Sequence, residues 1–182
     1  MKTVLMMLMA VALASASTVT FLGTSGANNG SVFVGPYSLI EDDLYISGTC
    51  ISFDLHVGPP WTWQAEREYI GSFSGPMRTE LLEAEWLNQQ FASNSDWAGI
   101  QQAIWTLFGA GYSDPDTLSW VARSEANWGS VDPNSFYVLV PVTLDETQSY
   151  LVDVPEPGMF WLIGGGLVAI GAAGRRMRTS HR

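Results

Sequence analysis

The sequence predicts an α+β fold with β-sandwich or barrel-like strands, an inserted helical subdomain and one C-terminal transmembrane helix. Three observations lead to this prediction. Apolar residues recur at period two before residue 58 and again after residue 135, helical patterns fill the middle, and a long uncharged stretch precedes the last arginines. Strands followed by helices and then by strands again are typical of α+β domains.

The strands are expected first. Short strands within residues 18–45 are joined by the glycine- and asparagine-rich turn at 26–30. A stronger strand is predicted over residues 45–57, because side chains two apart share one face of a strand. One face carries Ile51, Phe53, Leu55 and Val57, and the other carries Cys50, Ser52, Asp54 and His56. Another short strand is expected from Trp61 to Phe73, before Gly75-Pro76.

Three helices and a returning strand complete the body. Residues 77–91 carry an apolar stripe, and the acidic residues Glu83 and Glu85 are expected on its solvated side. Residues 97–108 form a second helix behind an Asn-Ser-Asp cap, and residues 116–128 form a third. A strand pattern returns over residues 135–144.

The chain divides into a signal peptide (1–16), an extracellular body (17–153) and a sorting tail (154–182). Lys2, an apolar run and the small residues 14–16 predict a cleaved secretory signal, with a buried N-terminal helix as the alternative. In the tail, 17 uncharged residues (158–174) are long enough to approach the lower limit for a bilayer span, although a buried core helix is the alternative. The arginines that follow place that end on the cytoplasmic side.

The tail also resembles the PEP-CTERM sorting signal of Gram-negative bacteria. The matching parts are Val154-Pro155-Glu156-Pro157, the apolar span, and the arginines Arg175, Arg176 and Arg178. This resemblance implies that exosortase, a membrane peptidase, recognises the protein as a partner. The span would hold the protein in the inner membrane before processing, and the product would end at the cell surface or in the extracellular matrix.

The charge of the body excludes one class of partner. Between Ser17 and Asp153 there are three basic and 17 acidic residues, which give a net charge of −14. A surface of this sign repels phosphate backbones, so we expect no binding to nucleic acid.

Two residues of the body suggest chemistry. Cys50 is the only cysteine, and Gln101 lies in the centre of the apolar face of the second helix. A buried small thiol and a glutamine bonded to backbone are the plain alternatives. A thiolate can, however, attack a glutamine carbonyl, expel ammonia and leave an internal thioester. Candidate walls for such a dry pocket are Trp61, Trp97 and Trp105.

The segments around these two residues resemble the motif pair of bacterial thioester domains. The matching residues are Thr49-Cys50-Ile51 and Ile100-Gln101-Gln102-Ala103-Ile104-Trp105, and residues 84–91 resemble the segment before the family's glutamine. The resemblance covers residues 49–109 and implies a thioester between Cys50 and Gln101 that attaches covalently to an amine or hydroxyl of a partner. Thr49 stands where the family usually has an aromatic residue, and Ile100 where threonine is common.

Other chemistries fit the sequence less well, and we expect neither an enzyme nor a cofactor. A cysteine hydrolase needs a histidine near Cys50, but His56 lies six residues along the same predicted strand and His181 lies beyond the span. Zinc lacks ligands for the same reason, and the acidic residues Glu41, 42–43 and 114–116 suggest an exposed face rather than a calcium loop. The remaining hypothesis is a non-covalent protein of the exopolysaccharide or biofilm matrix, with tryptophans stacked on sugar rings.

Overall fold

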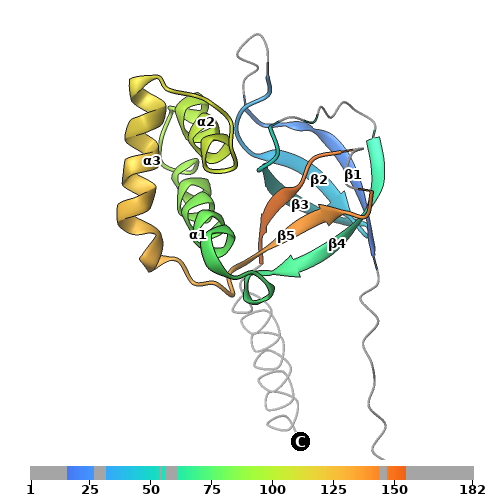
Figure 1. Ribbon diagram of the computed structural model, residues 1–182. Coiled ribbons are helices and arrows are strands. Elements are labelled where there is room, and N and C mark those ends of the chain that lie inside the picture. Colours follow the sequence, from blue (N-terminus) through green and yellow to red (C-terminus); the bar gives the residue numbers. More distant parts are fainter. Residues whose placement is uncertain (1–15, 27–31, 54, 56–60, 144–146, 155–182) are drawn as a thin grey trace, which may run out of the picture.

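The body is a closed six-stranded β-barrel with three helices on one side (Figure 1). The computed structural model describes residues 16–26, 32–53, 55, 61–143 and 147–154. Around the barrel the strand order is β1-β2-β3-β6-β5-β4, and every neighbouring pair is antiparallel. The strands are β1 (Ser17–Thr24), β2 (Tyr37–Glu41), β3 (Leu44–Cys50), β4 (Trp61–Tyr69), β5 (Phe136–Pro141) and β6 (Tyr150–Asp153).

The helices are inserted between β4 and β5. They are α1 (Gly75–Gln90), α2 (Trp97–Leu107) and α3 (Pro115–Asn127), with short 3₁₀ turns η1 (Ile70–Ser72) and η2 (Trp128–Ser130) at the two ends of the insertion. Figure 1 shows α3 outermost, with α1 and α2 between it and the barrel. The predicted α+β class, with barrel-like strands and a helical insertion, is confirmed.

Short acidic side chains fix the turns and helix starts. Asp42 and Asp43 form the β2–β3 hairpin turn with φ of 45° and 70°, a conformation that Asp tolerates better than most residues. Asp96 caps α2 by accepting a hydrogen bond from the Gly99 amide at 3.1 Å, and Asp114 caps α3 in the same way. The second oxygen of Asp96 accepts from the Trp120 indole at 2.7 Å, so this cap also ties α2 to α3.

Two apolar clusters form the core. One fills the barrel interior with side chains from all six strands, including Cys50, and also takes in Trp105 of α2. The other lies between the barrel and the helices. Strand β5 serves both clusters, because Tyr137 and Leu139 belong to the interior cluster while Phe136 and Val138 belong to the helical one.

The long strand predicted over residues 45–57 is wrong after Cys50 at the residues that the structure describes, which are 51–53 and 55. Strand β3 ends at Cys50, and residues 51–53 are irregular. The Ile51 amide still bonds to the Ser149 carbonyl, but the Ser149 amide then donates to the Ser52 hydroxyl, which replaces the next backbone partner. Strand β5 stops at Pro141, short of the predicted residue 144, and β6 was not predicted at all.

Most of the two predicted targeting segments lies outside the described residues. Of the signal peptide (1–16) only Ala16 is described, and of the tail (154–182) only Val154. In the part of the chain that the structure describes, none of the helices has both the length and the apolar character needed to cross a bilayer.

Candidate functional site

Cys50 and Gln101 meet in the core of the body. Cys50 is the last residue of β3, and Gln101 lies in the second turn of α2, with its side chain facing the barrel. Both residues are 0% exposed. The Gln101 Nε2 donates a hydrogen bond to the Cys50 backbone carbonyl at 2.8 Å, which holds the carboxamide against the residue that carries the sulfur.

The other end of the same carboxamide is left unpaired. Among the described residues, Gln101 Oε1 finds no hydrogen-bond partner although it is fully buried. A buried acceptor without a partner costs about 1–3 kcal/mol, so the fold retains this group at a loss of stability. An apolar residue in this position would avoid that loss, which makes the glutamine a candidate for chemistry.

The environment of the thiol keeps it protonated. Cys50 Sγ donates to the Ser52 carbonyl at 3.1 Å. Burial raises the pKa of the Cys50 thiol to about 12, and the nearby Trp105 indole lowers it in part. Within the described chain the Trp105 Nε1 has no hydrogen-bond partner of normal geometry, so this donor next to the sulfur is also unpaired.

The aromatic wall around the sulfur differs from the predicted one. Trp105 is 2% exposed and belongs to the interior cluster with Cys50, as do Tyr37 and Tyr150. In contrast, Trp61 is 48% exposed, and Trp97 packs on Phe91 in the helical cluster.

The two tyrosines of this wall were missed by the sequence analysis. Their rings lie 5.4 Å apart, centroid to centroid, and burial raises the pKa of both hydroxyls. Tyr37 could have been assigned to the inner face from its period-two relation to Leu39. Tyr150 lies on β6, and no strand was expected there.

Two further aromatic rings, Phe53 and Tyr112, pack on the outer side of Trp105. Phe53 contacts both Trp105 and Tyr112 at centroid distances of 5.5 Å, and Tyr112 stacks on Trp105 at 6.2 Å. Phe53 is 38% exposed, so this trio runs from the surface inward to the sulfur. It separates the thiol from bulk water on this side.

Thr49, one residue before the cysteine, links the site to α1 and to the start of the tail. Its hydroxyl donates to Asn88 Oδ1 at 2.5 Å. The Asn88 Nδ2 in turn donates to Glu85 and to Asp153, each at 3.2 Å. The hydroxyl therefore has a structural role at a position where the resembled family usually has an aromatic ring.

Glu85 corrects one expectation for this helix. It was expected on the solvated face, but it is 1% exposed, and Glu83 is 8% exposed. Burial, and then the neighbouring Asp153 carboxylate, raise the pKa of Glu85 to about 8. The apolar stripe of α1 faces the barrel and the other helices over a wider arc than the sequence pattern suggested.

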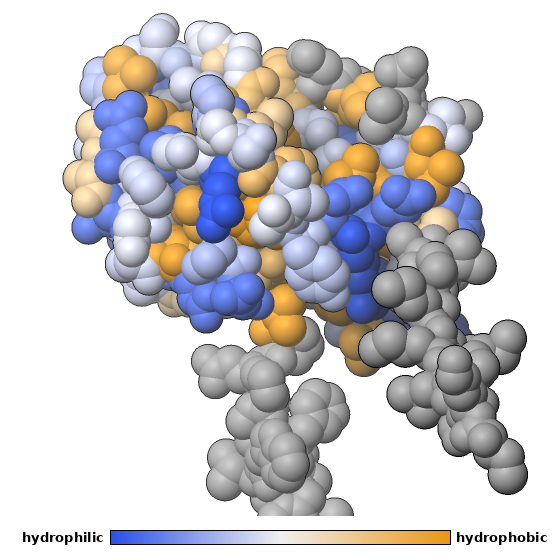
Figure 2. All heavy atoms as spheres, turned by 60° about the horizontal axis from the view of Figure 1, so that its bottom comes forward, coloured by the Kyte–Doolittle hydropathy of each residue, from blue (hydrophilic) through white to orange (hydrophobic). Residues whose placement is uncertain are grey.

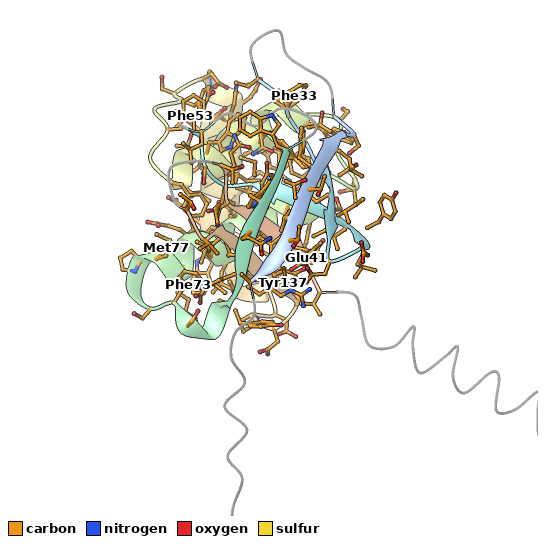
Figure 3. All side chains as sticks on the ribbon, turned by 90° about the vertical axis from the view of Figure 1, so that its right-hand side faces the viewer. Phe33, Glu41, Phe53, Phe73, Met77 and Tyr137 are labelled. Atoms are coloured by element: carbon orange, nitrogen blue, oxygen red, sulfur yellow. The ribbon has the colours of Figure 1, made fainter. Side chains whose placement is uncertain are left out.

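Glu41 was also expected on an exposed acidic face, and this is wrong. Its side chain is fully buried, bonded to Arg67 at 2.6 Å and to the Tyr137 hydroxyl at 2.7 Å. Figure 3 shows Glu41 and Tyr137 side by side. No cluster of three or more histidine, cysteine or acidic residues suited to a metal ion occurs among the residues that the structure describes.

A cavity of about 430 Å³ opens beside the site, between the barrel and the helices. Its lining begins with Ile51, Ser52 and Phe53, directly after the cysteine, and continues to Phe73 and Met77. Figure 3 shows Phe53, Phe73 and Met77 along one side of the molecule. The cavity is a described space beside this region that could admit a small molecule, and a smaller one of about 240 Å³ is lined by Phe53, Gly111 and Tyr112.

The arrangement brings together a thiol, a carboxamide carbonyl and an unpaired indole donor in a water-poor interior. An acyl transfer from the amide nitrogen to the sulfur needs the thiol and the carbonyl, and a hydrogen-bond donor in a dry site would assist it. A Cys–His hydrolase would need an imidazole as well, and His56 lies outside the described residues.

Comparison with known proteins identifies the tail. Residues 153–178 match the PEP-CTERM protein-sorting motif. No curated protein and no solved structure matches the chain. The motif supports an exported protein that is anchored at the membrane before processing, with exosortase as its processing partner.

Proposed function

We propose that the body of this exported protein forms an internal thioester between Cys50 and Gln101 and uses it to attach covalently to a partner. The observation that supports this most directly is the buried contact between the two residues. The Gln101 amide nitrogen is held on the Cys50 carbonyl at 2.8 Å, while its carbonyl oxygen has no partner within the described structure.

The reaction conserves all atoms without a cofactor. The Cys50 sulfur bonds to Gln101 Cδ, the bond from Cδ to Nε2 breaks, and the thiol proton leaves with the nitrogen as ammonia. The product is a thioester, which stores an acyl group that an amine or hydroxyl can later take.

Trp105 is the residue best placed to assist this step. Negative charge develops on Gln101 Oε1 as the sulfur adds, and a donor in a dry site stabilises such charge strongly. Trp105 lies four residues after Gln101, on the same face of α2, and its buried indole N–H is unpaired and close to the sulfur. The attacking sulfur thus has an unpaired donor beside it, and the carbonyl that it would attack carries an unpaired acceptor.

The raised thiol pKa favours storage over rapid formation. At neutral pH the thiol is protonated, so attack on the amide is slow and needs the enforced contact between the groups. Once the thioester has formed, the sulfur carries no charge that would need solvent. Burial then keeps water away from the acyl group. The same burial that slows the first step therefore protects its product.

An intact-mass measurement on the exported protein tests the proposal. Thioester formation lowers the mass by one ammonia, about 17 Da, and methylamine should convert the product to a chain one methylene heavier than the plain sequence. A mass equal to the plain processed sequence, with Cys50 freely alkylated after unfolding, would overturn it and favour the non-covalent matrix protein.

Matched variants locate the bond. Gln101→Glu and Cys50→Ala should each abolish the mass deficit, whereas Gln102→Glu should keep it. Gln102 is the neighbouring amide, half-buried and bonded to Thr117 instead of the barrel. Trp105→Phe removes the indole donor but keeps a ring, and we expect about 10-fold slower formation. Retention of the deficit in Gln101→Glu would contradict the assignment.

A further inference from the structure

The cavity beside Cys50 is apolar and bounded by both halves of the fold. Strand β5 contributes Val138 and Val140, α1 contributes Met77 and Leu81, and Phe108 follows α2. Its volume of about 430 Å³ lies within the range of small-molecule sites. Figure 2 shows apolar patches at the surface between the helices on the left and the barrel on the right.

The cavity and the thiol share one stretch of backbone. The Ser52 carbonyl accepts a hydrogen bond from the Cys50 thiol, with sulfur and oxygen 3.1 Å apart, and Ser52 itself lines the cavity. Because Cys50 and Gln101 are 0% exposed, a nucleophile cannot reach them directly from bulk solvent. The lining of the cavity includes Ile51 and Ser52, so the cavity borders the backbone that directly follows the sulfur-bearing residue.

The lining selects against hydroxyl-rich molecules. Nine apolar side chains and two serines line the cavity, and none of these described residues is charged. The Ser52 hydroxyl already accepts a hydrogen bond from the Ser149 amide at 3.1 Å. A sugar would bury several hydroxyls with too few partners, at about 1–3 kcal/mol for each unpaired group. An alkyl or aromatic group has no such cost.

The net charge of the body favours the approach of a cation over that of an anion. Its net charge of −14 attracts amines, which carry a positive charge at neutral pH, and repels anions. The cavity thus suits a molecule with an apolar body and an amino end. This combination belongs to alkyl and aryl amines.

We propose that this cavity selects the nucleophile, and that its occupant is a primary amine on an apolar alkyl or aromatic group. The inference rests on the proposed thioester and names its substrate class. The amine nitrogen bonds to the Gln101 carbonyl carbon, the bond from that carbon to the sulfur breaks, and the amine proton passes to the sulfur. The product is a secondary amide on Gln101 and a restored Cys50 thiol.

The test compares three amines on the full processed chain at equal free-base concentration. The rate of thioester opening, followed by intact mass, should be about 10-fold higher with 2-phenylethylamine than with methylamine, because the ring is buried in the cavity. Glucosamine, of similar size but rich in hydroxyls, should be slower than 2-phenylethylamine. Equal rates for the three, or a faster reaction with glucosamine, would overturn the inference while leaving the thioester intact.

Variants tie the preference to the cavity. Val140→Trp and Met77→Trp fill the lining from β5 and from α1, and each should reduce the rate ratio of 2-phenylethylamine to methylamine to about 1. Val142→Trp is the matched control, since Val142 is 54% exposed and does not line the cavity. A ratio unchanged in both filled variants would contradict the inference. A wild-type chain without a mass deficit would overturn the thioester and the inference together.

Discussion

Two buried polar side chains in this body, Glu41 and Gln101, differ in how far their hydrogen-bonding atoms are paired. At Glu41 each carboxylate oxygen has a partner, one on Arg67 at 2.6 Å and the other on the Tyr137 hydroxyl at 2.7 Å. At Gln101 the amide nitrogen is bonded, but the oxygen has no partner among the described residues, and neither has the Trp105 indole N–H. The first site contributes to stability through paired groups. The second leaves hydrogen-bonding capacity unused, as reactive sites often do.

The comparison gives a way to distinguish structural from chemical roles. Removing a fully paired group should destabilise the fold, because its partners lose their bonds. Removing Gln101, which is only half-paired, should cost less stability, because the lost hydrogen bond is offset by the removal of an unpaired buried oxygen. Variants at the two sites should therefore separate clearly when stability and thioester content are both measured.

The largest effect is expected for Glu41→Ala. This change leaves the Tyr137 hydroxyl without its acceptor and Arg67 without its anion, and part of the loss is offset because the Arg67 side chain is 41% exposed. We expect the free energy of unfolding to fall by about 2–4 kcal/mol in urea titrations. Glu66→Ala, at an exposed position on β4, is the control and should change little. A loss below about 1 kcal/mol at Glu41 would remove the contrast between the two sites.

Glu85 is the intermediate case, since it is bonded to Asn88 and Gln89 but lies against Asp153. Its pKa is raised from 4.5 to about 8, so the folded state binds the proton more tightly than the unfolded state. Its contribution to stability is therefore complete below about pH 4.5 and is lost as the pH rises toward 8. The free energy of unfolding should decrease over this range, and Glu85→Gln should weaken the decrease. A wild-type profile that rises between pH 5 and 8, with Glu85→Gln identical to it, would show the assignment to be wrong.

The smallest effect is expected for Gln101→Leu. The comparison is made between Cys50→Ala and the double variant Cys50→Ala/Gln101→Leu, because neither can form the thioester. Leucine removes an unpaired oxygen and one hydrogen bond to the Cys50 carbonyl, so the two free energies of unfolding should agree within about 1 kcal/mol. A loss of about 3 kcal/mol or more would place Gln101 among the structural groups, like Glu41.

Much of the fold was predictable from local patterns. The Asp96 and Asp114 caps mark the starts of α2 and α3, and the apolar stripe of α1 marks its extent within two residues. The end of β3 was not predictable, because the Ser52 hydroxyl replaces a backbone carbonyl as the acceptor for the amide of Ser149, 97 residues away. Strand β6 is four residues long, too short to give a clear alternation.

The pairing of Cys50 with Gln101 was predictable from the sequence, and the residues around the pair were less so. Gln101 was conspicuous because an amide in the middle of an apolar helix face needs an explanation. Tyr37 and Tyr150 surround the sulfur only because the barrel closes, which depends on pairings between distant strands. The burial of Glu41 has the same cause, since its partners come from β4 and β5.

The barrel holds the chain up to the first residue of the predicted linker. The Val154 amide is bonded to the Ser135 carbonyl at 2.7 Å, and the sorting motif begins at residue 153. Three residues, 155–157, then separate this bond from the uncharged run, and even fully extended they reach only about 10–14 Å. A motif that anchors the protein at the membrane before processing would therefore hold the body close to the membrane surface.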